Sequence, residues 1–400
     1  MDFTASSRHL KFVEDYIDEN VKPFYGNTHT STSITGLQTS CFRHEARTII
    51  ENATNCHRKD DVVLMLGSGS TAAINHMVHV LNLHVPLKSE APQPVVFVGP
   101  FEHHSNELPW RESCAKVIRI PQDETGHMCL KTLEKYLKEY EKTCKLMIGS
   151  FSACSNITGV LSPVNKIAAL LHRHGALAFF DYATAGPYVD IDMNPVVIGD
   201  DAPFVYKDAV FVSPHKYIGG PGSCGVLIAK KKLFSNPIPF KPGGGTVYFV
   251  TSNDHRYLSN RIEREEGGTP DILGSIRAGL AFHIRSEVSS KVLHSLEKEM
   301  CDMILKRFDT MRNVVVVARQ VQPRLPVISF LVRSIVVQSQ ENHHSASLTP
   351  FHRVFKITSL KEYHSHHTKK ISLEFDFVTK TSDRYVTERG TSIKTLSLRC

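Results

Sequence analysis

Between residues 60 and 230, apolar runs of strand length alternate with segments of helical pattern, and this alternation restricts the fold more than any other feature. The apolar runs fall at 61–66, at the start of 95–110, at 115–120, at the start of 144–159, at 176–180 and at 209–212. Helical patterns begin near Thr71 and cover 130–142 and 162–174. Repeated strand–helix–strand units predict an α/β fold whose mainly parallel sheet is covered by helices. In such a sheet, ligands bind at the carboxyl ends of the strands.

The stretch DAVFVSPHKYIGGPGSCG (208–225) ends one of these strands and places Lys216 before a Gly/Pro-rich turn. A lysine that forms a Schiff base needs a partly desolvated position, so that its amine can be neutral and nucleophilic. The glycines allow backbone and ligand to approach each other closely. A solvent-exposed lysine before a turn is the alternative, and the motif alone leaves it open.

Residues 67–75 (GSGSTAAIN) connect the buried strand 61–66 to a helix. Free backbone N–H groups and the helix dipole both favour an anion at such a junction. The loop lacks the Gly-Lys-Ser/Thr ending of a Walker motif and the glycine spacing of a dinucleotide site. We therefore expect it to bind a single phosphate monoester.

Polar side chains follow three other strands, at His103, Asn156 and Asp181. His103 and His104 are a poor metal pair because no third ligand lies at a suitable spacing, whereas one imidazole could stack on a flat cofactor. A carboxylate after the apolar run 176–180 is costly unless it is paired, although Asp181 could instead cap a turn. A phosphate loop, an imidazole, an amide, an acid and a lysine are together the parts that pyridoxal 5′-phosphate (PLP) requires.

Six motifs occur in the order and spacing of one known family. They are GSTAAIN (69–75), EHHSN (102–106), SNITG (155–159), FFDYAT (179–184), SPHKYIGGPGSCG (213–225) and EEGGTPD (265–271). Over about residues 20–334 the chain resembles the class V aminotransferases, the family that includes the cysteine desulfurases. The resemblance implies an aspartate-aminotransferase-like large domain with a mainly parallel seven-stranded sheet. It also implies a smaller α+β C-terminal domain, and leaves open whether this chain contains all of it.

The resemblance also implies a role for each site residue. Lys216 would be the Schiff-base lysine, Asp181 the partner of the pyridine nitrogen, and His103 the stacking residue. Asn156 would approach the phenolic oxygen of the ring, and the phosphate would be held by Ser70, Thr71, Ser213 and His215. Thr269 matches a position that reaches the phosphate of a neighbouring subunit, which implies a homodimer with shared sites. Thr184 stands where the family usually has Gln, and its hydroxyl could take over that contact.

The sequence divides into four segments. Residues 1–22 form an amphipathic helix, with Leu10, Phe12, Val13 and Tyr16 on one face; 23–271 form the PLP-binding domain; 272–334 begin the small domain. Residues 335–400 match no pattern of the family and hold ten Lys/Arg, six Asp/Glu and six His, which favours a divergent, basic, His-rich and disordered tail. Dispersed charges make nucleic-acid binding by this tail a weaker alternative than a solvated surface.

Composition restricts the location and the chemistry. No run of eighteen apolar residues is present, so no membrane span is expected. The polar N-terminus does not resemble a secretion signal, and nine scattered cysteines indicate a reducing compartment, so we expect a cytoplasmic protein with no metal site.

We expect a PLP-dependent enzyme that acts on an amino acid through Lys216 by transamination, desulfuration or elimination. Desulfuration is disfavoured, because Cys400 is terminal and Cys224 lies in the glycine turn. The alternative is an impaired or truncated protein that binds the cofactor or a partner without turnover.

Overall fold

The computed structural model describes residues 3–28, 32–87 and 91–332, and the backbone of 353–365, 368–381 and 384–387. The chain separates into two compact units. The larger unit holds residues 5–155 and 161–293, and the smaller holds 1–4, 156–160 and 294–400.

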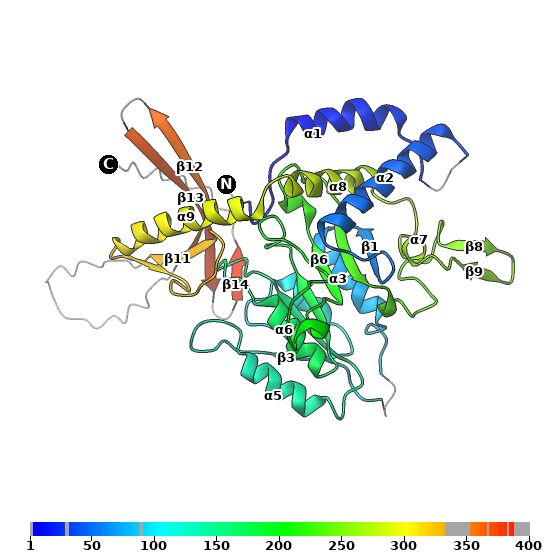
Figure 1. The fold of residues 1–400 in the computed structure, drawn as a ribbon, viewed down its shortest axis with the longest axis horizontal. Coiled ribbons are helices and arrows are strands. Elements are labelled where there is room, and N and C mark those ends of the chain that lie inside the picture. The colour runs from blue at the N-terminus through cyan, green and yellow to red at the C-terminus, as the bar shows by residue number, and fades with distance from the viewer. Residues whose placement is uncertain are drawn as a thin grey trace. The chain divides into compact units, whose positions relative to one another are not determined.

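A seven-stranded sheet forms the centre of the larger unit (Figure 1). Its strand order is β1-β7-β6-β5-β4-β2-β3, and only β7 runs antiparallel to its neighbours. The strands are β1 (Asp61–Leu66), β2 (Val95–Val98), β3 (Lys116–Arg119), β4 (Met147–Ser152), β5 (Leu177–Asp181), β6 (Ala209–Val212) and β7 (Gly225–Lys230). The predicted seven-stranded, mainly parallel sheet is thus confirmed, and β1, β2, β4, β5 and β6 end at one edge, called the carboxyl edge below.

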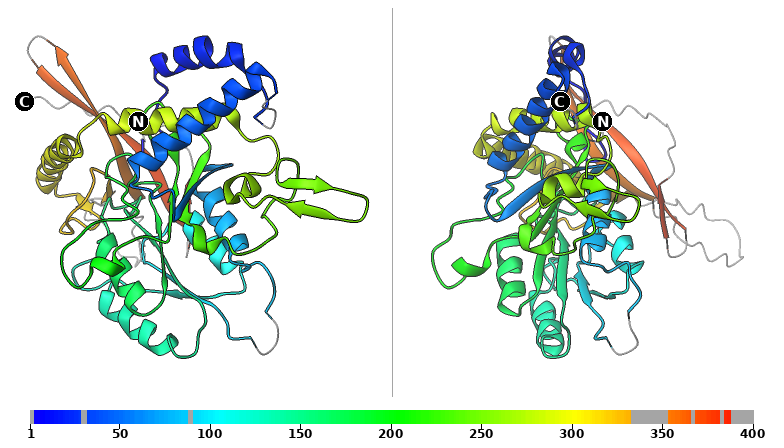
Figure 2. Two further views of the ribbon diagram at one scale, coloured as in Figure 1. Left: turned by 45° about the vertical axis from the view of Figure 1, so that its right-hand side comes forward. Right: turned by 90° about the vertical axis from the view of Figure 1, so that its right-hand side faces the viewer.

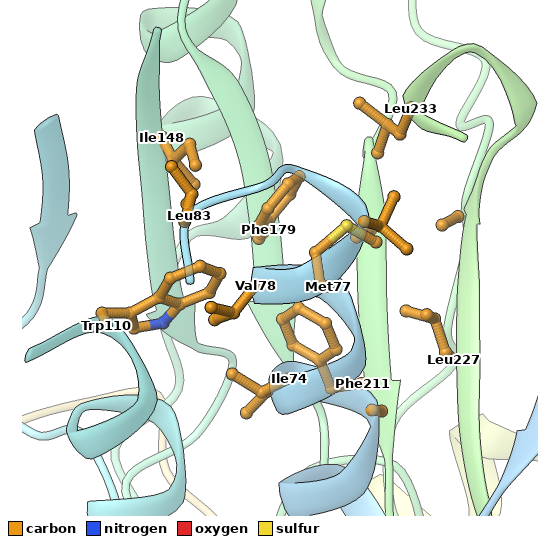
Figure 3. Close-up of a cluster of buried hydrophobic side chains, with 14 of the residues drawn as sticks. Ile74, Met77, Val78, Leu83, Trp110, Ile148, Phe179, Phe211, Leu227 and Leu233 are labelled. Carbon is orange, nitrogen blue, oxygen red and sulfur yellow. The ribbon is translucent and has the colours of Figure 1, made fainter. Parts of the chain in front are cut away.

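Helices cover both faces of this sheet (Figure 2). The helices of the larger unit are α2 (Ile34–Ala53), α3 (Gly69–Val80), α4 (Leu108–Arg111), α5 (Leu130–Tyr140), α6 (Val164–Arg173), α7 (Arg261–Glu265) and α8 (Ile272–Ser286). On one face, Ile74 and Met77 of α3 pack among alternate strand residues, which include Phe179, Phe211 and Leu227 (Figure 3). On the other face, Leu171 of α6 lies so close to Gly149 of β4 that a side chain there would collide with it.

The N-terminal segment is helical from Lys11 onward, in α1 (Lys11–Tyr16), η1 (Ile17–Val21) and η2 (Lys22–Phe24). Its buried face consists of Val13, Ile17 and Val21, which pack against α8. The prediction that Phe12 and Tyr16 lie on the packed face is wrong, because these side chains are 60% and 39% exposed. The steps of four from Val13 to Val21 follow one helix face, whereas Phe12 lies about 100° around the helix from Val13.

Two further strands of the larger unit, β8 (Val247–Val250) and β9 (His255–Tyr257), form an antiparallel hairpin. Three consecutive side chains of β8 are exposed, namely Tyr248, Phe249 and Val250, at 78%, 43% and 67%. Figure 1 shows the hairpin projecting from the body of this unit.

The smaller unit has an antiparallel sheet of β10 (Val314–Val316), β11 (Ile328–Val332), β12 (Arg353–Ser365), β13 (Thr368–Thr381) and β14 (Arg384–Thr387). Cys301, Leu305 and Phe308 of α9 (Ser290–Asp309) pack on Ile328 and Phe330 of β11. A helix on an antiparallel sheet is an α+β arrangement. Strands β12 to β14 fall in the segment expected to be a tail, of which only this backbone is described, and the four-segment division of the chain stays a prediction.

Candidate active site

Four loops at the carboxyl edge carry most of the candidate residues. The loop after β1 leads into α3 with Ser70 and Thr71, and the chain after β2 carries His103. Asp181 is the last residue of β5, and Ser213 follows β6 directly. These loops converge because the strands run in one direction, so residues far apart in the sequence reach the same edge.

The predicted phosphate loop is closed by two serines. The Ser213 hydroxyl accepts a hydrogen bond from the Ser70 backbone N–H at 2.8 Å and donates to the Ser70 hydroxyl at 3.2 Å. Gly69 has a φ of 58°, and a side chain there would meet the Ser213 oxygen at 2.8 Å, so glycine is required. The α3 N-terminus and two hydroxyl groups therefore lie together, as an anion site needs.

A second set of hydrogen bonds connects this loop to His103. The Thr71 hydroxyl donates to the Ser105 hydroxyl at 2.7 Å, and the His103 Nδ1 atom lies 3.1 Å from the same Ser105 oxygen. His103 precedes a short 3-10 helix, η3 (His104–Asn106), and accepts at Nδ1 from the Ser105 N–H at 3.2 Å. The chain therefore turns between β2 and η3, and the hydrogen bonds to Ser105 fix the orientation of the His103 ring.

Glu102, a residue of the EHHSN motif without a predicted role, lies between the chain after β2 and the end of β4. Its carboxylate accepts from the Ser152 N–H at 3.0 Å, the Ser152 hydroxyl at 2.6 Å, the Asn106 amide at 2.6 Å and the Gly99 N–H at 3.2 Å. Burial raises the pKa of Glu102 to about 7, these donors lower it, and the charge of Asp181 adds to the increase. Glu102 therefore holds the start of the His103 loop to the end of β4, next to Asp181.

The raised pKa of Glu102 has a measurable consequence for stability. Because the folded state favours the protonated acid, wild-type stability should fall as the pH rises from 4.5 toward 7. Over this window we expect a loss of about 3 kcal/mol in the free energy of unfolding. Glu102→Gln, which mimics the protonated acid, should largely lose this slope when unfolding by urea is measured at several pH values. Exposed Glu139→Gln on α5 is the control, and equal slopes in wild type and the Glu102 variant would contradict the assignment.

Asp181 is a buried carboxylate whose surroundings favour a cation beside it. Its side chain is 4% exposed, and its Oδ1 atom accepts from the Ala183 N–H at 2.8 Å. Burial raises the pKa of Asp181, while the Ala183 hydrogen bond and then the charge of Lys216 oppose the increase. A protonated ring nitrogen would offset the burial of this carboxylate, so Asp181 fits the pyridine end of PLP.

Lys216 is half-buried and ends the short 3-10 helix η5 (Pro214–Lys216), which begins one residue after β6. Its charge acts on both Asp181 and His215. Burial, and then the charge of Lys216, lowers the pKa of His215, so this ring is neutral at neutral pH. The His215 Nδ1 atom lies 3.1 Å from the Ser6 hydroxyl, which brings the N-terminal segment to the site.

Three predicted residues have other surroundings. Thr184 is buried, at 6% exposure. Thr269 is exposed and accepts from the Asn27 amide at 3.4 Å. Asn156 belongs to the smaller unit, so its approach to the ring remains a prediction.

A buried ion cluster that the sequence analysis missed anchors the loop before Thr269. Glu266 accepts from Arg47 at 2.7 Å, from Arg43 at 2.8 Å and from the Met65 N–H at 2.7 Å. Its side chain is only 6% exposed. Burial alone would raise the pKa of Glu266, but the charges of Arg47 and Arg43 outweigh burial and lower it. The spacing of the two arginines along one helix face was the available signal.

Two observations in the described part of the chain concern other classes of site. No group of three or more His, Cys, Asp or Glu side chains there could hold a metal ion. No helix there has both the length and the apolar character needed to cross a membrane.

Solved structures of known proteins share this fold. An apo cysteine desulfurase from Thermococcus onnurineus has a TM-score of 0.66 and 21% identity, covering 82% of this chain and 77% of its own. A NifS-like protein from Rickettsia africae has a TM-score of 0.65 and 18% identity, covering 84% and 82%. The larger unit thus has the fold of the fold-type I PLP-dependent transferases.

Sequence relatives identify the family. The chain matches the family described as aminotransferase class-V over residues 1–344. A probable cysteine desulfurase of Halalkalibacterium halodurans is 25% identical over 339 residues, covering 84% of this chain and 78% of the relative. One from Staphylococcus aureus is 24% identical over 340 residues, covering 84% and 77%. The chain belongs to the class V aminotransferase family, whose members are PLP-dependent enzymes acting on amino acids.

Proposed function

We propose that this chain binds PLP covalently through Lys216 and acts on an amino acid. The observation that carries the proposal is the position of Lys216, whose charge acts on the buried Asp181 at the carboxyl edge. The phosphate loop closed by Ser70 and Ser213 belongs to the same edge. When bound, PLP supplies an electron-accepting ring that stabilises negative charge at the substrate α-carbon.

Each residue would contribute a separate effect. Asp181 would hold a proton on the ring nitrogen, because a buried carboxylate stabilises a cation beside it. Ser70, Thr71, Ser213 and the α3 N–H groups would fix the phosphate, and His103 would cover the ring and exclude water from that face. The Nζ atom of Lys216 would hold the cofactor and then take the proton from the substrate α-carbon as a general base.

The reaction class is proposed only as far as the residues allow. Three of the four proteins reported above are named as cysteine desulfurases or probable cysteine desulfurases, so L-cysteine is the first substrate to test. Desulfuration needs an accessible thiol, and Cys224 does not provide one, because burial raises its pKa to about 12. Elimination from cysteine or transamination of another amino acid needs no such thiol, and both fit the same site.

A homodimer is part of this proposal. Thr269 is exposed, as a residue that reaches a neighbouring phosphate has to be. The exposed apolar side chains of β8 are also typical of an interface. A cytoplasmic location is proposed from the reducing environment that the scattered cysteines indicate.

The test is an absorbance spectrum of the purified protein, followed by titration with amino acids, L-cysteine first. We expect a visible band that shifts with at least one amino acid and does not shift with its D-enantiomer. A bound chromophore that no amino acid shifts would favour the alternative, a protein that holds the cofactor without turnover. Absence of any protein-bound chromophore after incubation with PLP would contradict the proposal.

A further inference from the structure

The segment before α1 lies along the loop that carries Lys216. The Ser7 N–H donates to the His215 backbone oxygen at 3.1 Å. Further along the same loop, the Gly219 N–H donates to the Arg8 backbone oxygen at 2.8 Å. Because Lys216 lies between His215 and Gly219 in the sequence, the N-terminal segment holds the backbone on both sides of this lysine.

Two further contacts hold the N-terminal segment in place. Gly219 has a φ of 77°, and a side chain there would lie 3.3 Å from both Leu10 and Val13, so these residues pack closely on the loop. Arg277 of α8 donates to Glu14 of α1 at 2.9 Å. The Arg277 hydrogen bond lowers the pKa of Glu14 to about 2, although burial opposes this shift. Apolar packing and an ion pair therefore fix the segment in one position on the loop.

The Ser6 side chain contacts both the backbone and the ring of His215. Its hydroxyl donates to the His215 backbone oxygen at 3.3 Å, and its oxygen lies 3.1 Å from the His215 Nδ1 atom. A hydroxyl has one hydrogen and a carbonyl oxygen can only accept, so Nδ1 carries the proton and donates to Ser6. In a neutral imidazole, this arrangement leaves Nε2 as the acceptor.

The other side of the His215 ring faces the phosphate loop. A side chain at Gly69 would lie 3.9 Å from the His215 Cδ2 atom, which is bonded to Nε2 and lies across the ring from Nδ1. The same side chain would lie 2.8 Å from the Ser213 oxygen, which closes the loop. Nε2 is therefore the ring nitrogen on the side of the phosphate loop.

A phosphate monoester and Nε2 suit each other as partners. The second pKa of such a phosphate is about 6, so the phosphate can donate its own hydrogen to Nε2 or accept from a protonated Nε2. In both cases the proton lies between Nε2 and a phosphate oxygen. The Nδ1–H group stays with Ser6 in both cases, so the Ser6 contact is compatible with either form.

We propose that Ser6 is a positioning residue of the phosphate site, which holds the His215 ring with Nε2 toward the phosphate. This inference rests on the proposed function, in which the loop closed by Ser70 and Ser213 binds the phosphate of PLP. Without the Ser6 hydroxyl, the ring can rotate about its Cβ–Cγ bond and either nitrogen can carry the proton. A fraction of the molecules would then present no suitable nitrogen to the phosphate.

The test is titration of the full-length, cofactor-free protein with PLP and, separately, with pyridoxal, which lacks the phosphate. The visible absorbance band measures the binding of both compounds. Ser6→Ala should weaken PLP binding about five-fold, as is typical for the loss of one hydrogen bond, and leave pyridoxal binding unchanged. Ser6→Thr keeps a hydroxyl group at this position and should restore wild-type affinity for PLP.

A double-mutant cycle with His215→Ala separates the ring contact from the backbone contact. His215→Ala keeps the backbone oxygen that accepts from Ser6 but removes the ring. Adding Ser6→Ala to this variant should cause no further loss of PLP affinity, because the two side chains act through one contact. Ser235→Ala is the control and should bind both compounds like wild type. Ser235 is exposed, and its neighbour Asn236 donates to Asn82 beyond the C-terminal end of α3, away from the phosphate loop.

Three results would overturn the inference and leave the proposed function intact. The first is equal PLP affinity in wild type and Ser6→Ala. The second is an equal loss of affinity for PLP and pyridoxal, which would show a general disturbance of the loop. The third is a further loss when Ser6→Ala is added to His215→Ala, which would place the effect of Ser6 outside the ring. If wild type itself bound no PLP, the proposed function would fail, and this inference with it.

Discussion

Replacing Lys216 with alanine is expected to lower turnover of any amino-acid substrate by at least about 10²–10⁴-fold, the range that a general base contributes. The variant loses the group that would take the α-proton and also the amine that would hold the cofactor. Asp181 and the Ser70–Ser213 pair remain, so PLP should still bind, but without covalent attachment. Turnover is measured by single-substrate kinetics, and attachment by the mass of the protein after borohydride reduction.

The control for this experiment is Lys131→Ala, an exposed lysine at the start of α5. It should retain wild-type turnover and covalent labelling. Added ethylamine could restore part of the turnover of Lys216→Ala, because a small amine can enter the space that the side chain leaves. Undiminished activity of Lys216→Ala without any amine would remove Lys216 from the mechanism.

Replacing Glu266 with alanine is expected to cost about 3–5 kcal/mol in the free energy of unfolding, because it leaves Arg43 and Arg47 as buried charges without a counterion. The carboxylate has a lowered pKa in the folded state, so its stabilisation is present above pH 4.5 and is lost as the pH falls below that value. Wild type and variant should therefore differ most near pH 7 and converge in acid. Urea unfolding of the cofactor-free protein at pH 7 and at a pH below 4.5 measures this difference.

Glu263→Ala on α7 provides the matched control, since this carboxylate is exposed and lies only three residues away. Surface changes of this kind usually alter stability by less than about 0.5 kcal/mol. If Glu266→Ala and Glu263→Ala had the same small effect, the ion cluster would not stabilise the loop that carries Thr269.

Much of the sheet was predictable because β1, β2, β5 and β6 consist almost entirely of short apolar runs. Val62 to Leu64 and Ala209 to Val212 are fully buried, as such runs predict for a parallel sheet. The polar residues that follow the parallel strands lie together at the carboxyl edge, because these strands run in one direction. Strand order and the antiparallel direction of β7 depend on long-range pairing, which no local pattern contains.

Within the site, the missed residues are those whose role depends on tertiary partners. Glu102 accepts hydrogen bonds from Ser152, fifty residues further along the chain. Tyr217 follows Lys216 directly, but only the packing of α8 and Gly186 shows that its ring is buried against Phe282. The packed face of the first helix was misplaced because Phe12 and Tyr16 are large and apolar, although Val13, Ile17 and Val21 provide the periodic stripe.

The most direct measurement of the central claim is to identify which residue carries the cofactor. Wild-type protein is incubated with PLP, reduced with borohydride, digested with a protease and analysed by mass spectrometry. We expect one modified peptide, with the pyridoxyl group on Lys216 and none on the exposed Lys131. Attachment to another lysine, or no attachment at all, would contradict the assignment of the carboxyl edge as a PLP site.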